Sequence, residues 1–171
     1  KWLLVCGSAS ATMARQVRAL VEHTSWAQLK IEPARFARTS AAQAEQYSRT
    51  SATKYSFHGS LIMTVAAADS QTSATLPPTL PPPLILRCQA EAAASRVAQS
   101  RPQGLFLSGG DTAEAVLERI HASGVVLHEE ITSGLILGRI AGGSCDKLPV
   151  VTKAGSFGND NTLVQLIQLL R

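Results

Sequence analysis

The feature that most constrains this chain is a local pattern that occurs in three places: a short apolar run, a turn rich in glycine and hydroxyl residues, and then a helical pattern. "WLLVC" at 2–6 leads into "GSAS", "GLFLS" at 104–108 into "GGDT", and "LPVVTK" at 148–153 into "AGSFG". Short apolar runs bounded by such turns are typical of buried strands. Strands that alternate with helices pair into a parallel sheet, whose carboxyl-end turns gather along one edge. The sequence therefore predicts an α/β layered sandwich with a largely parallel or mixed central sheet flanked by helices.

The remaining elements follow from the spacing of apolar residues. Met13, Val17, Leu20 and Val21 share one helical face, and Ser10 stands at the N-cap position before them. We expect further helices in the first part of 38–56, at 84–101, at 111–124 with Gly124 as the stop signal, and at 161–170. We expect further strands between 29 and 33 and at 60–66, 125–131 and 134–142. The last of these strands is the candidate for an edge of the sheet.

Length and composition favour one globular domain over residues 1–171. Apolar residues make up 45% of the chain and charged residues 16%, which is unlike a disordered protein. The apolar runs fall far short of the roughly 18 residues that a membrane span needs. The first ten residues lack the layout of a signal peptide. We therefore expect no membrane partner.

Charge and cysteine usage narrow the function classes further. The net charge is +4, but the lysines and arginines are scattered and aromatic residues make up only 5%. This distribution favours binding of small anions over nucleic acid. Cys6, Cys88 and Cys145 are odd in number and far apart, which indicates a reducing compartment, expected to be the cytoplasm, without a disulfide framework or a cysteine-rich zinc site.

The segment 69–83, "DSQTSATLPPTLPPP", is expected to be a loop within the domain. Its prolines remove backbone donors and fix φ, so neither a helix nor a central strand fits. A stiff exposed connector is the favoured interpretation. A polyproline ligand for a partner domain is the alternative.

The turn after residue 108 has the chemistry of an anion site. Gly109 and Gly110 have no Cβ, so a ligand can approach the backbone closely. Asp111 stands where an N-cap belongs, with Glu114 at capping-box spacing. The N–H groups of a helix start attract phosphate, although a tight turn before a capped helix explains the same residues. Neither GxxxxGK[ST] nor GxGxxG is present, which excludes a standard P-loop or Rossmann assignment.

The other two turns offer similar groups. Lys153 lies beside Gly155 and Gly158, and a lysine next to flexible backbone can neutralise a phosphate as a point charge. A surface lysine in a turn is the alternative. Ser8 and Ser10 can hydrogen-bond a phosphate, a ribose or the N–H groups of their own helix. For Ser10 the capping role is the safer interpretation.

No metal site held by protein side chains is expected. His128, Glu129 and Glu130 are consecutive in an expected strand, where neighbours point to opposite faces. HExxH spacing is absent, and so is GxSxG. A solvated strand end explains these residues better than a metal site.

Taken together and in this order, the three turns resemble those of the C-terminal, nucleotide-binding domain of the four-carbon acid sugar kinase family. The matching segments are "LLVCGSASATMARQV" at 3–17, "LFLSGGDTAEAVLERI" at 105–120, and "SGLILGRIAGG" at 133–143 leading to "LPVVTKAGSFG" at 148–158. Each segment alone is weakly specific, and the combination is specific. Ser156 departs from the family, which commonly has another glycine there.

The resemblance implies ATP-dependent phosphorylation of a threonate-, erythronate- or oxo-tetronate-like acid, with ATP and Mg²⁺ as cofactors. It implies nucleotide contacts at Ser8 or Ser10, at Gly109, Gly110, Asp111 and Thr112, and at Gly155, with Lys153 and Gly158 in the same motif. Asp111 would contact Mg²⁺ directly or through water.

The resemblance also implies a missing partner, the N-terminal domain that binds the sugar acid. The chain enters an apolar run at Lys1 without a methionine, so we expect a fragment that forms the C-terminal half of a two-domain kinase. The catalytic base is unassigned and would lie in the other half. The fragment alone is expected to bind nucleotide and to phosphorylate nothing, and a homodimer is compatible with it. A non-catalytic nucleotide-sensing or interaction module is the alternative function.

Overall fold

The computed structural model describes residues 1–7, 10–32, 39–54, 59–65 and 82–170. Ser8 and most of the proline-rich segment at 69–83 therefore lie outside the described residues. The elements are β1 (Trp2–Cys6), α1 (Ala11–His23), β2 (Ala27–Ile31), α2 (Ala41–Lys54), β3 (Leu61–Val65), α3 (Pro82–Ser100), β4 (Gly104–Ser108), α4 (Gly110–Arg119), β5 (Gly124–Thr132), β6 (Leu135–Ala141), the 3₁₀ turn η2 (Gly143–Cys145), β7 (Pro149–Lys153) and α5 (Thr162–Leu169).

The described strands form one mixed sheet in the order β2-β3-β1-β4-β7-β6-β5. The first five strands of that order are parallel, while β6 is antiparallel to both β7 and β5. At the carboxyl ends of three neighbouring strands, Cys6 pairs with Ser108, and Ser108 pairs with Lys153. The predicted α/β class is confirmed, and the three glycine turns leave the sheet side by side.

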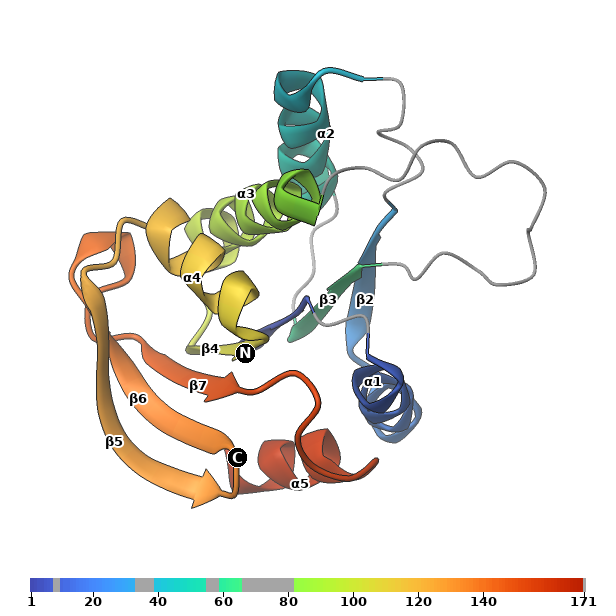
Figure 1. Ribbon diagram of the computed structural model, residues 1–171, viewed down its shortest axis with the longest axis vertical. Helices are drawn as coiled ribbons and strands as arrows, with labels where there is room; N and C mark the ends of the chain where they lie inside the picture. The colour runs from blue at the N-terminus through green and yellow to red at the C-terminus, as the bar shows by residue number, and fades with distance from the viewer. Residues whose placement is uncertain (8–9, 33–38, 55–58, 66–81, 171) are drawn as a thin grey trace.

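Helices cover both faces of the sheet (Figure 1), with α2, α3 and α4 on one face and α1 and α5 on the other. Side chains alternate between the two cores along each strand. In β1, Leu3 and Val5 belong to the core beneath α2–α4, whereas Leu4 and Cys6 belong to the core beneath α1 and α5. The sheet is therefore buried on both sides, as its apolar central strands require.

The start of α4 differs from the prediction. The N-cap is Gly109, whose carbonyl accepts the first helical hydrogen bond from Ala113 N at 2.9 Å, and Asp111 lies inside the first helical turn. Gly109 has a φ of +99°, a conformation that glycine adopts without strain. The predicted capping box of Asp111 and Glu114 is wrong because the chain turns two residues earlier, and the cap makes no side-chain hydrogen bond.

The end of α4 also comes earlier than predicted. The helix ends at Arg119, and His121, with a φ of +59°, takes the left-handed position expected of a glycine. His121 N donates to Glu118 O and Ala122 N donates to Leu117 O, which together form a Schellman-type end. Gly124 is the first residue of β5 and not a helix stop.

Two further boundaries correct the sequence analysis. The edge strand at this side of the sheet is β5, and β6 lies between β5 and β7. Helix α3 begins at Pro82, inside the segment predicted as a loop, because proline is tolerated in the first turn of a helix. The three cysteines are free and buried. No helix of the described residues combines the length and hydropathy needed to cross a membrane.

Candidate functional site

The three glycine turns are joined to one another by backbone hydrogen bonds. Gly7 N, directly after β1, donates to Ser108 O at the end of β4 over 3.2 Å. Gly109 N, directly after β4, donates to Lys153 O at the end of β7 over 3.0 Å. Each turn therefore starts from a fixed position relative to the next one.

The first turn lies against the start of α4. A Cβ on Gly7 would overlap the Thr112 hydroxyl and come within 2.8 Å of Gln89 Oε1. Both Thr112 and Gln89 are buried. The Thr112 side chain, predicted as a nucleotide contact, thus packs against Gly7 of the first turn.

The second turn presents backbone to the solvent. Gly110 is exposed, and a Cβ added there would meet nothing within 4 Å. Asp111 is exposed in the first turn of α4. The first N–H groups of a helix have no partner within the helix and carry its positive end. Gly110 and Asp111 therefore offer N–H donors, and Asp111 also a carboxylate, at the carboxyl edge of the sheet, whereas the Gly109 N–H already donates to Lys153 O.

The third turn is held by a buried lysine. Lys153 Nζ donates to Ala154 O at 2.9 Å and to Gly155 O at 3.2 Å, and the side chain is only 3% exposed. Burial lowers the pKa of Lys153 below its ordinary value, while the neighbouring Cys6 acts in the opposite direction. Gly158 has a φ of +85° with Thr162 packed behind it, so the backbone itself requires glycine at 158.

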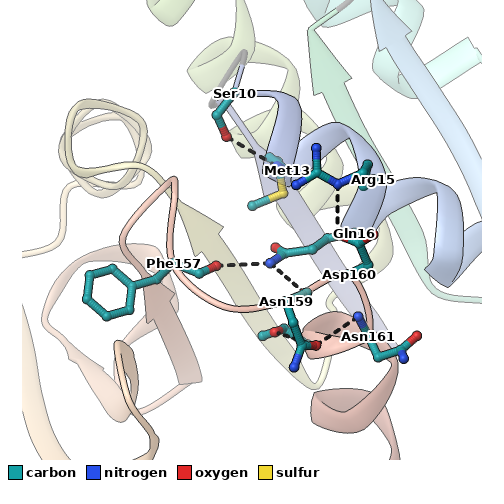
Figure 2. A network of polar contacts seen from close by, with 9 residues as sticks. Ser10, Met13, Arg15, Gln16, Phe157, Asn159, Asp160 and Asn161 are labelled. Carbon is teal, nitrogen blue, oxygen red and sulfur yellow. Dashed lines mark hydrogen bonds and ion pairs between the residues drawn. The ribbon is translucent and has the colours of Figure 1, made fainter.

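Helix α1 fastens the third turn from the side (Figure 2). The Ser10 hydroxyl accepts a hydrogen bond from Met13 N at 3.2 Å, which confirms its predicted N-cap role. The same hydroxyl donates to Gly155 O at 3.3 Å. Two predicted site residues, Ser10 and Gly155, are therefore in direct contact although 145 positions separate them.

Two more residues of α1 reach the segment between β7 and α5. The amide of Gln16, which is fully buried, donates to Phe157 O and to Asn159 O, both at 2.9 Å. Arg15 and Asp160 form an exposed ion pair at 2.8 Å. Sequence reasoning missed Gln16, although a polar residue within the apolar face of Met13, Val17 and Leu20 was a usable signal.

Behind the turns lies a row of three buried polar side chains from β1, β4 and β7: Cys6, Ser108 and Lys153. Burial raises the pKa of the Cys6 thiol to about 12, against the influence of Lys153. The thiol is therefore protonated and unreactive at neutral pH. The Ser108 hydroxyl has no hydrogen-bond partner within the described part of the chain.

His128, Glu129 and Glu130 are exposed on β5, as expected for a solvated strand. No group of three histidine, cysteine, aspartate or glutamate side chains within the described ranges is placed to hold a metal ion. A metal ion at this edge of the sheet would therefore need ligands from a bound molecule or from water.

Comparison with known proteins decides the family. Residues 3–163 match the family described as the nucleotide-binding C-terminal domain. The chain belongs to this family. The match spans all three turns, and together with the similarity to the kinases described next it confirms the resemblance to the C-terminal domain of four-carbon acid sugar kinases.

Members with known activities are similar over part of the chain. A D-threonate kinase of Bordetella bronchiseptica is 42% identical over 87 residues, which are 51% of this chain and 22% of that protein. A D-erythronate kinase of Heliobacterium modesticaldum is 33% identical over 75 residues, which are 44% of this chain and 17% of that protein. The matched regions are thus less than a quarter of the kinases' own length.

Solved structures share the fold of the whole chain. A domain of unknown function from Bordetella bronchiseptica, crystallised as a domain-swapped dimer with bound citrate, has a TM-score of 0.77 and 29% identity over 98% of this chain and 40% of its own. A Haemophilus influenzae protein has a TM-score of 0.65 at 14% identity, covering 100% of this chain and 40% of its own, which shows a common fold.

Proposed function

We propose that this domain binds ATP with Mg²⁺ and forms the nucleotide-binding part of a kinase that phosphorylates a four-carbon sugar acid of the threonate, erythronate or oxo-tetronate type. The observation that carries the proposal is the edge formed by the turns of β1, β4 and β7, where the start of α4 lies beside the turn above buried Lys153. The identity to D-threonate and D-erythronate kinases supports the substrate class.

The residues at this edge fit a chain of phosphates. Gly110 leaves open space beside its backbone, so an anion can reach the N–H groups of the α4 start without meeting a side chain. Lys153 adds a positive charge on the same edge. The exposed Asp111 carboxylate is the group of this turn that suits Mg²⁺.

Phosphoryl transfer depends mainly on positioning and on the neutralisation of charge. Bound ATP would supply the phosphoryl group that is transferred to a hydroxyl of the acid. The residues of this chain would hold the phosphates through the N–H groups of Gly110 and Asp111, with Gly109 leaving the backbone accessible, and through the turn at Gly155. The sugar acid and the base that takes its proton would lie in parts of the kinase beyond the region shared here.

Titration calorimetry with Mg-ATP on the 171-residue chain tests nucleotide binding. We expect heat from binding at one site and a rise in melting temperature. Absence of both would overturn the proposal. The chain alone is expected to leave D-threonate and D-erythronate unphosphorylated, whereas the chain joined to a sugar-acid-binding domain is expected to turn over ATP with one of them. ATP binding without turnover in the joined protein would favour the nucleotide-sensing alternative.

The assembly state is a separate proposal. The related Bordetella bronchiseptica domain is a domain-swapped dimer. We propose that the kinase containing this domain is also a homodimer. Size-exclusion chromatography of that kinase with light-scattering detection measures its mass in solution. A mass equal to that of one kinase polypeptide would contradict the proposal.

A further inference from the structure

Lys153 is buried beneath the third glycine turn, and its ammonium group faces backbone carbonyls. Lys153 is only 3% exposed, and no carboxylate of the described residues forms an ion pair with it. Its ammonium instead contacts two successive carbonyl oxygens, those of Ala154 and Gly155. A group in this position is aimed at the backbone of the turn and away from the solvent.

The two carbonyls fix the direction of two N–H groups. None of the peptide bonds between described residues is cis, and in a trans peptide the C=O and the N–H point in opposite directions. Because Ala154 O and Gly155 O both face the Lys153 ammonium, the N–H groups of Gly155 and Ser156 point away from it. Neither N–H has a hydrogen-bond partner among the described residues.

The function of the third turn depends on the orientation of its central peptide, between Gly155 and Ser156. Phe157 N donates to Ala154 O at 3.2 Å, so residues 154–157 form a β-turn with Gly155 and Ser156 in its centre. Types I and II of such turns differ by a flip of the central peptide, and type II needs a positive φ at the third residue, which Ser156 does not have. Gly155 O accepts from Lys153 Nζ and also from the Ser10 hydroxyl at 3.3 Å, so two donors add to the preference of Ser156 and hold this peptide in the observed orientation.

We propose that Lys153 is a positioning residue for phosphate: with Ser10, it holds the Gly155–Ser156 turn carbonyl-inward, so that the N–H groups of Gly155 and Ser156 donate to a phosphate oxygen of the nucleotide. This inference rests on the proposed nucleotide binding and deepens it. It assigns Lys153 an indirect role in place of the direct contact that the sequence suggested. The charge still favours an anion nearby, but the hydrogen bonds come from the backbone.

Amide NMR of the ¹⁵N-labelled whole chain, titrated with Mg-ATP, tests the proposal without any substitution. We expect the amide protons of Gly155 and Ser156 to move downfield together with those of Gly110 and Asp111. If only the α4 amides respond, the proposal for Lys153 is wrong while nucleotide binding stands. If none of the four responds, the proposed function fails and this inference fails with it.

Lys153→Met, which keeps the length of the side chain without its charge or donors, tests the role of the ammonium. We expect Mg-ATP affinity to fall about tenfold, because the turn is then no longer held in its binding orientation before the phosphate arrives. The responses of the Gly155 and Ser156 amides should disappear, while those of Gly110 and Asp111 remain. Weaker binding with unchanged responses at Gly155 and Ser156 would show direct contact and overturn the proposal.

Two further variants complete the test. Lys147→Met removes an exposed lysine outside the three turns and should change neither affinity nor the four amide responses. Ser10→Ala removes the second donor to Gly155 O together with the N-cap acceptor of Met13 N, and we expect it to reduce the response of the Ser156 amide more than that of Gly155. This second variant keeps the proposal testable if Lys153→Met does not fold. An unchanged Ser156 response in Ser10→Ala would contradict the shared positioning role.

Discussion

The hydroxyl of Thr112 occupies the space beside the Cα of Gly7, where any other residue would carry its Cβ. Gln89 Oε1 closes the same space from α3, 2.8 Å from that position. The turn after β1, the start of α4 and the middle of α3 are thus packed against one another without room for a methyl group. The glycine in the first turn is required by the fold.

Gly7→Ala should therefore destabilise the protein. Overpacking of a filled interior costs about 1–3 kcal/mol, and we expect a loss near the upper end because two buried polar groups must move. Urea unfolding followed by circular dichroism measures the change. Gly124→Ala is the control, since a Cβ there meets nothing within 4 Å, and it should cost less than about 0.5 kcal/mol. Equal stability of the two variants would contradict the packing argument.

Gly110→Ala, unlike Gly7→Ala, should leave stability unchanged and weaken nucleotide binding. A Cβ at this exposed residue meets nothing within 4 Å, so the free energy of unfolding should stay within about 0.5 kcal/mol of the unsubstituted protein. Under the proposed function, the methyl group would stand where phosphate approaches the α4 start, and Mg-ATP affinity should fall about tenfold. Calorimetry and urea unfolding of the same variant separate the two effects. An unchanged Mg-ATP affinity would contradict phosphate binding at this turn.

Gln16 and Arg15 allow a comparison within one network. Gln16→Leu removes a buried amide that donates to two carbonyls, and we expect a loss of about 2 kcal/mol in the free energy of unfolding. Arg15→Ala breaks an ion pair whose side chains are both more than half exposed, so its cost should be below about 0.5 kcal/mol. A larger loss from Arg15→Ala than from Gln16→Leu in urea unfolding would refute this ranking.

The buried Cys6 thiol predicts a loss of stability in alkaline solution. Its pKa rises from an ordinary value of 9.0 to about 12 in the fold, so the unfolded chain releases this proton first. The stabilisation is complete below pH 9 and is lost as the pH rises from about 9 to about 12, amounting to about 4 kcal/mol at most. Lys153, whose pKa burial lowers, acts in the opposite direction below its ordinary pKa.

Cys6→Ala isolates that contribution. Urea unfolding between about pH 8 and pH 11 should show a smaller decline for the variant than for the unsubstituted chain. Cys88 also has a raised pKa, so part of the decline should remain in the variant. Parallel declines in the two proteins would show that Cys6 does not titrate across the unfolding transition.

Local patterns predicted those parts of the fold that depend on local chemistry. The apolar run of Leu3, Leu4 and Val5 indicated a strand covered on both faces, and the spacing of Met13, Val17 and Leu20 indicated the face that α1 buries. The order of strands at the edge was not predictable in this way, because pairing depends on residues far apart in the chain. The sequence analysis favoured residues 134–142 for the edge, whereas β5 occupies it and β6 lies one strand further in.

In the candidate site, too, local sequence predicted some features, while others depend on residues far apart in the chain. Glycine and hydroxyl content marked all three turns, yet N-cap statistics favour Asp111 over Gly109, and the observed φ of +99° at Gly109 decided the cap. Nothing local to residue 153 indicated that its ammonium would lie beneath the turn. That position follows from strand register, which turns Lys153 into the same core as Cys6.

The hydrogen bonds between α1 and the third turn determine when this part of the domain can fold during synthesis. Residues 10 and 16 belong to the first helix of this domain, but their partners in the turn lie 141 to 145 positions later in the chain. Contacts of such long range form late, because a long loop must close before they can stabilise anything. During translation, therefore, the contacts of α1 with the third turn can form only after residues 155–159 have emerged from the ribosome. The newly made domain is then expected to become competent for its ligand in a single late step.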